Sequence, residues 1–133
     1  MRNKTKKGNK SLDFEIVFFE KLINDKPDFT DALIPLAELY TKSGRYKEGL
    51  SLDIRLSKLR PGDSTVYYNM ACSYSLLGKI DEAISTLKQA VRLGYSDFQY
   101  MCNDPDFLNL KEDQRYRKFV AKIAHNNQAR ESK

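Results

Sequence analysis

The chain has 133 residues and a formal net charge of +5, and it contains 6 glycines, 4 prolines and 2 cysteines. Sparse glycine and proline indicate a single, mainly helical domain, and the cysteine count excludes a disulfide-dense scaffold. No apolar stretch reaches the length of a membrane span, and residues 1–10 lack the apolar core of a secretory signal, so we expect a cytoplasmic protein.

The basic residues are concentrated towards the two ends of the sequence. Residues 1–10 carry five bases and no acid, residues 111–133 carry seven bases and three acids, and residues 11–110 carry 11 bases and 15 acids. This pattern predicts a disordered basic leader over residues 1–10 and a frayed tail over residues 126–133. Nucleic acid stays a weaker alternative partner, because no aromatic side chains for base stacking are interleaved with the basic residues.

The spacing of apolar residues predicts a series of helices. The first runs from Ser11 to about Asn24 and ends in a turn sequence, Asn-Asp-Lys-Pro. Helices over residues 30–43 and 46–59 follow, separated by Gly44, which can adopt the left-handed conformation that a helix end needs. The same scheme then repeats, with one helix from residue 64 to Gly78 and another over residues 81–93.

The last part of the sequence predicts three further helices. Residues 97–103 form one short helix, and Asp104 followed by Pro105 predicts another, with an aspartate cap and a proline at the first helical position. Asp113 is expected to cap a longer helix that continues to His125 and carries an apolar stripe on one face.

Residues 30–63 and 64–97 align with each other at an offset of 34 residues. The identical pairs are Ala37/Ala71, Tyr40/Tyr74, Gly44/Gly78, Glu48/Glu82, Ser51/Ser85, Leu59/Leu93 and Asp63/Asp97. A period of 34 residues is typical of a helix-turn-helix solenoid, and such solenoids usually provide binding surfaces.

These residues resemble the tetratricopeptide repeat. The second repeat carries the family pattern with Tyr67, Ala71, Tyr74, Gly78, Ala83, Leu87 and Ala90, and the first with Leu33, Ala37, Tyr40, Gly44, Gly49, Leu56 and Pro61. Residues 11–27 resemble the second helix of a further repeat, and residues 97–125 resemble a C-terminal cap seen in many bacterial proteins of this kind. The resemblance implies an all-α, right-handed superhelical stack of antiparallel helix hairpins over residues 11–125.

One residue departs from the family pattern. Asp53 occupies a place where the family usually has a large apolar side chain. A buried carboxylate needs a hydrogen-bonding partner, so Asp53 is expected either to have one or to lie at an exposed edge.

The resemblance also implies a concave groove lined by the first helix of each hairpin. Its expected lining residues are Ile34, Glu38, Thr41, Lys42, Tyr68, Asn69, Cys72, Ser75 and Leu76. We expect a protein or peptide partner to bind there, unless the chain covers the groove with its own tail. A family subclass holds C-terminal carboxylates with lysine and asparagine side chains, but of the corresponding residues here only Asn69 matches, and Glu38 would repel a carboxylate.

The first predicted helix carries two apolar stripes. Leu12, Ile16, Phe19 and Ile23 form the stripe that is expected to pack on the next helix. Phe14, Phe18 and Leu22 form a second stripe on another face, which predicts contact with a partner helix or with a second copy of the chain. A self-assembling homo-oligomer is therefore the alternative function.

No set of residues suits catalysis. His125 is the only histidine, and Cys72 and Cys102 alone make a poor zinc site. The sequence has neither a glycine-rich phosphate loop nor a nucleophile elbow. We therefore expect no enzymatic activity, no cofactor and no metal.

Overall fold

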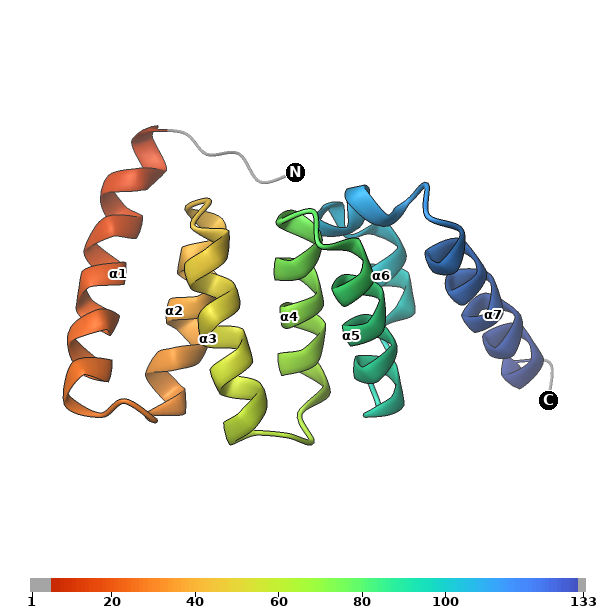
Figure 1. Cartoon of the computed structure of the whole chain (residues 1–133), viewed down its shortest axis with the longest axis horizontal. Coiled ribbons are helices and arrows are strands. Elements are labelled where there is room, and N and C mark those ends of the chain that lie inside the picture. The colour runs from red at the N-terminus through yellow and green to blue at the C-terminus, as the bar shows by residue number, and fades with distance from the viewer. Residues whose placement is uncertain (1–5, 132–133) are drawn as a thin grey trace.

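The computed structural model describes the backbone of residues 6–131 and the side chains of residues 11–127. Within this part of the chain, all regular structure is helical (Figure 1). The elements are α1 (Lys6–Asp25), α2 (Thr30–Lys42), α3 (Tyr46–Leu59), α4 (Ser64–Leu76), α5 (Ile80–Arg92), α6 (Phe98–Asn103), the 3-10 helix η1 (Pro105–Leu110) and α7 (Gln114–Glu131). The predicted all-α class is confirmed.

The two predicted hairpins are present as the antiparallel pairs α2–α3 and α4–α5, which lie side by side in Figure 1. Each turn is made by a glycine with positive φ, at 85° for Gly44 and 76° for Gly78. The amide of the next residue then bonds back to a tyrosine carbonyl, from Arg45 to Tyr40 at 2.7 Å and from Lys79 to Tyr74 at 2.9 Å. Both hairpins therefore close with the same hydrogen bond, 34 residues apart.

The ends of the helical region differ from the prediction. Helix α1 begins at Lys6, within the segment predicted as a basic leader, and residues 1–5 of that segment lie outside the described part. Helix α7 continues to Glu131, past the end predicted at His125. Neither extension contains proline, so no residue in either lacks the backbone amide that a helix needs. The C-terminal extension also contains glutamine, alanine and arginine, which favour a helix. Residues 132–133 of the predicted frayed tail lie outside the described backbone.

Two apolar clusters hold the stack together. The first joins α1, α2 and α3, with Ile16, Leu33 and Leu36 at its centre, and the predicted stripe of α1 packs here. The second joins α4, α5 and the C-terminal segment, with Leu87 and Phe107 fully buried. Complete burial of one such side chain is worth roughly 1.5–3 kcal/mol. Most of each core therefore comes from one hairpin, and Val66 of α4 joins the first core to the second hairpin.

Helix α1 is also attached to the first hairpin by polar contacts. The hydroxyl of Tyr40 donates a 2.5 Å hydrogen bond to Glu20 on α1. The guanidinium of Arg45 lies 4.6 Å from the centre of the Tyr40 ring and 3.9 Å from the same carboxylate. These contacts fix the position of α1 beside α2.

The segment after α5 folds back against α4. Asp104 caps η1 by accepting a 3.0 Å hydrogen bond from the amide of Asp106, with Pro105 at the start of the helix, as the sequence predicts. The hydroxyl of Ser75 donates to the Asp106 carbonyl at 2.6 Å, and the side-chain amide of Asn109 donates to the Ser75 carbonyl at 2.7 Å.

Among residues 6–131, no helix has the length and apolarity needed to cross a bilayer.

Candidate peptide-binding groove

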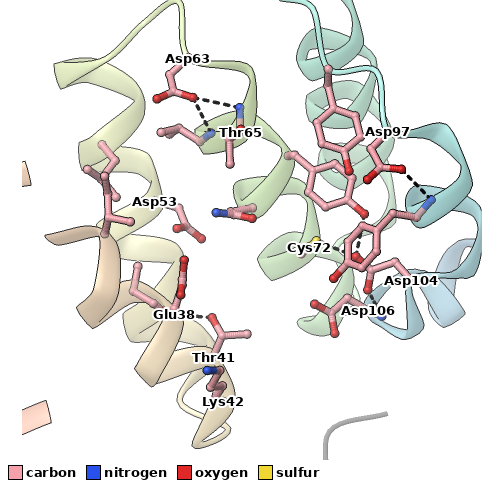
Figure 2. Close-up of a pocket in the computed structure, with 18 residues that line it drawn as sticks. Glu38, Thr41, Lys42, Asp53, Asp63, Thr65, Cys72, Asp97, Asp104 and Asp106 are labelled. Carbon is pink, nitrogen blue, oxygen red and sulfur yellow. Dashed lines mark hydrogen bonds between the residues drawn. The ribbon is translucent and has the colours of Figure 1, made fainter. Parts of the chain in front are cut away.

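A cavity of about 530 Å³ lies between α2, α3, α4 and residues 95–106 (Figure 2). We call it the groove. The first hairpin forms one wall, through Glu38 and Lys42 on α2 and Asp53 on α3. The opposite wall consists of α4 together with the returning C-terminal segment, which contributes Asp97 and Asp104. The groove is thus formed jointly by both hairpins and the cap.

Seven of the nine predicted groove residues line this cavity, namely Ile34, Glu38, Thr41, Lys42, Tyr68, Asn69 and Cys72. The other two, Ser75 and Leu76, do not. Ser75 is fully buried beneath η1, to which its hydroxyl is bonded. Leu76 is the last residue of α4 and is half-buried outside the cavity. The C-terminal segment therefore covers the end of α4 and leaves the middle of the groove open.

Eleven lining residues were not predicted. They are Ala37, Asp53, Leu56, Asp63, Thr65, Val66, Tyr95, Asp97, Tyr100, Asp104 and Asp106. The residues from 95 onwards enter the groove because the cap folds back, and this contact joins positions more than 30 apart in the chain. The Asp-Pro-Asp sequence at residues 104–106 predicts a helix cap, but local pattern gives no sign that Asp104 also faces α4.

Asp53 is buried, with only 4% of its surface exposed. The Ser73 hydroxyl on α4 donates a 2.6 Å hydrogen bond to its carboxylate, which is the partner that a buried acid requires. Burial raises the pKa of Asp53 to about 7, the Ser73 hydrogen bond opposes this rise, and the negative charge of Glu38 adds to it. Figure 2 shows the Asp53 and Glu38 side chains directed towards each other in the groove.

The opposite wall is aromatic. The Tyr68 hydroxyl donates a 2.7 Å hydrogen bond to Asp104. The Tyr68 ring stacks on Tyr95 at 4.2 Å between centroids and meets Phe107 edge to face at 5.4 Å. Burial and the bond to Asp104 raise the pKa of Tyr68 far above its usual range, so this residue stays a neutral donor. The centre of the Tyr100 ring lies 6.2 Å from that of the Tyr68 ring, and Tyr100 is 55% exposed.

One group of possible metal ligands lies at this wall. The Cys72 sulfur and a carboxylate oxygen from each of Asp104 and Asp106 lie within 4.8 Å of one another, and all three residues are buried. The two oxygens of Asp104, however, accept hydrogen bonds from Tyr68 and from the Asp106 amide. Capping and hydrogen bonding explain why these residues lie together.

The predicted interface residues on α1 differ in their exposure. Phe14 is 76% exposed and Phe18 is 53% exposed, whereas Leu22 is half-buried. The Phe18 ring meets that of Phe19 edge to face at 5.2 Å. Val17 is 48% exposed on the same helix. The apolar surface of α1 is thus centred on Phe14 and Phe18.

Comparison with known proteins identifies the repeat. Residues 64–93, which span α4 and α5, match the tetratricopeptide repeat family. The chain is 34% identical over 80 residues to a chloroplastic protein of Arabidopsis thaliana, an alignment that covers 58% of this chain and 24% of that protein. It is 36% identical over 74 residues to Superkiller protein 3 of Schizosaccharomyces pombe, an alignment that covers 56% of this chain and 5% of that protein.

The chain therefore spans about a quarter of the plant relative and about a twentieth of the yeast relative. Two helix hairpins at a 34-residue offset, closed by equivalent glycine turns, agree with the family match over the second hairpin. The chain therefore contains a tetratricopeptide repeat over residues 64–93.

Proposed function

We propose that this chain is a non-catalytic protein-interaction module that holds a peptide or a segment of a partner protein in the groove. The observation that carries the proposal is the open cavity of about 530 Å³ between the two hairpins and the cap. Its lining combines aromatic surface with exposed polar groups, which suits recognition of an extended or helical segment. Tetratricopeptide repeats generally serve protein–protein interaction, which agrees with this role.

The helices that form the groove pack on buried apolar cores, so little rearrangement on binding is expected. Ala71 and Ala83 are fully buried between α4 and α5 and let these helices pack closely. The Tyr68–Asp104 hydrogen bond fixes the position of the cap relative to α4. A preformed groove loses little conformational entropy when its ligand binds.

Selection from a random peptide library displayed against the immobilised chain tests this function. Asn69 lines the groove and is half-buried, so Asn69→Phe fills the cavity without removing a core side chain. Ser85→Phe places the same ring on the exposed face of α5 as a matched control. We expect the selected peptides to bind wild type and Ser85→Phe and to lose binding to Asn69→Phe, measured by fluorescence anisotropy. Selection of no peptide, or equal binding to all three proteins, would refute the proposal.

A second candidate function is self-association through α1. It is favoured by the exposure of Phe14 and Phe18, because neighbouring exposed aromatic side chains often mark an interface. Light scattering over a concentration series tests it: Phe18→Asp should raise the monomer fraction, while Leu108→Asp, at an exposed apolar residue of η1, should not. A wild type that is monomeric at every concentration would contradict this alternative.

A further inference from the structure

The charge of the groove is opposite to that of the chain as a whole. Among the described side chains of residues 11–127, its lining contains six carboxylic groups and one ammonium group, that of Lys42. The whole chain has 18 acidic and 23 basic residues, so the groove holds a third of the acids and almost none of the bases. A cavity lined by charges of one sign within low-dielectric protein walls concentrates this negative potential.

Three of these carboxylates have structural roles that account for their position. Asp63 caps α4 by accepting from the amides of Thr65 and Val66, and it lies 3.6 Å from the Arg60 guanidinium. Asp97 and Asp104 cap α6 and η1 in the same way. The positive end of each capped helix partly balances the negative charge there.

Glu38 and Asp53 do not cap a helix, and within the described side chains neither has a cationic partner. Glu38 is exposed, and among the side chains of residues 11–127 it forms no ion pair. Asp53 is bonded to the neutral hydroxyl of Ser73. The two acids come from different helices, α2 and α3, and both point into the groove (Figure 2). When both acids are ionised they repel each other, and a cation between them would remove the repulsion.

The opposite wall suits the rest of such a ligand. The exposed ring of Tyr100 and the stacked pair Tyr68–Tyr95 present aromatic surface to the same cavity. Aromatic faces attract cations as well as the methylene stem of a lysine or arginine side chain. An anionic peptide would find, in the described lining, only Lys42 to balance six carboxylic groups.

We propose that the groove selects a basic peptide, with a lysine or arginine end group held between Glu38 and Asp53 and its flanking residues against the tyrosine wall. This inference rests on the proposed function and specifies the chemistry of the partner. It identifies the occupant as a basic segment of another protein, because Glu38 and Asp53 line the groove without a cationic partner among the described side chains.

Three fluorescent peptides of about ten residues, in which alanine alternates with lysine, glutamine or glutamate, test this selectivity by anisotropy titration. We expect the lysine peptide to bind at least about tenfold more tightly than the glutamine peptide, and the glutamate peptide to bind most weakly. Glu38→Gln should weaken the lysine peptide about tenfold. Glu82→Gln, which removes the same charge from the exposed start of α5, should change its affinity less than about twofold.

Equal loss in Glu38→Gln and Glu82→Gln would overturn the inference, since it would indicate a general attraction to negative charge without a specific site. Preference for the neutral or acidic peptide, still abolished by Asn69→Phe, would also overturn it while leaving the proposed function intact. If the lysine peptide binds the chain that lacks residues 1–10 but does not bind the full chain, the occupant is the chain's own basic segment and the inference fails. The proposed function fails only if neither these peptides nor any library peptide binds the groove.

Discussion

Asp53 on α3 and Ser73 on α4 are joined by a buried hydrogen bond of 2.6 Å, which links the two hairpins at the base of the groove. The bond gives the acid a partner but supplies no positive charge. Desolvation therefore prevails, and the pKa of Asp53 rises from 3.8 to about 7. Between pH 3.8 and about pH 7, the folded protein consequently favours the protonated form of Asp53, whereas the unfolded chain favours the ionised form.

The first prediction concerns stability and pH. Between the unfolded pKa of 3.8 and the folded pKa of about 7, the native state binds the extra proton, so the free energy of unfolding falls as pH rises. We expect Asp53 to account for a loss of about 3 kcal/mol between about pH 5 and pH 8, as an upper estimate. In Asp53→Asn, the free energy of unfolding measured by urea denaturation should not show this fall between about pH 5 and pH 8. Asp28→Asn, in the exposed turn before α2, serves as the control and should retain it.

The second prediction concerns ligand affinity and pH. A cation beside Asp53 favours its ionised form, so a basic peptide should bind more tightly as pH rises through about 7. If only the ionised form binds, affinity should increase about tenfold between about pH 6 and pH 8, as measured by anisotropy. The other charged groups that line the groove are Glu38, Lys42, Asp63, Asp97, Asp104 and Asp106. A pH dependence that persists in Asp53→Asn would assign the effect to one of these groups.

The third prediction compares two aspartate caps. Asp104 is buried and its carboxylate accepts hydrogen bonds from the Asp106 amide and the Tyr68 hydroxyl, whereas Asp97 is exposed and its carboxylate accepts from the Tyr100 amide. Asp104→Ala should lower the free energy of unfolding by about 3 kcal/mol, because it also leaves a buried tyrosine hydroxyl without its acceptor. Asp97→Ala should cost about 1 kcal/mol. Thermal denaturation measures both, and losses of equal size would contradict this account.

The fourth prediction concerns a position where the repeats differ. A Cβ atom added at Gly49 would lie 2.9 Å from the Thr41 hydroxyl, whereas the second repeat accommodates Ala83 at the equivalent place with no exposure. The Thr41 hydroxyl donates to the Ala37 carbonyl and occupies the space beside Gly49. Alanine is the better helix former by about 1 kcal/mol, so Gly49→Ala should stabilise the protein in a Thr41→Ala background and do so less, or not at all, in wild type.

A double-mutant cycle of these two substitutions should give a coupling free energy of about 1 kcal/mol. Denaturant titration of the wild type, the two single variants and the double variant supplies the four values. Additive effects would mean that the hydroxyl of Thr41 moves aside at no cost.

The sequence predicts the hairpins well because their determinants are local. Gly44 and Gly78 end helices through their own backbone freedom, and Asp63 caps α4 through the amides that follow it directly. The same local logic places Ile34, Glu38 and Asn69 on the groove-facing helices.

The position of the cap cannot be predicted in this way. The Tyr68–Asp104 hydrogen bond joins residues 36 apart, and the Ser75–Asp106 bond joins residues 31 apart. The spacing of apolar residues does not indicate which residues so far apart in the chain will pair. The C-terminal wall of the groove and the burial of Ser75 therefore cannot be predicted from sequence patterns. For the same reason, the sequence could not decide whether Asp53 is buried, because its hydrogen-bond partner Ser73 belongs to the next repeat.

The stacking of each helix mainly on its neighbours along the chain has a consequence for how the protein folds. Contacts between residues close in sequence form quickly, because little chain entropy is lost in bringing them together, so either hairpin can nucleate folding. The groove forms later in folding than either hairpin. Its walls come from the first hairpin and from α4 with residues 95–106, which face each other only after both hairpins and the cap have packed. Ligand binding should therefore appear last in a refolding experiment, after helix content has recovered.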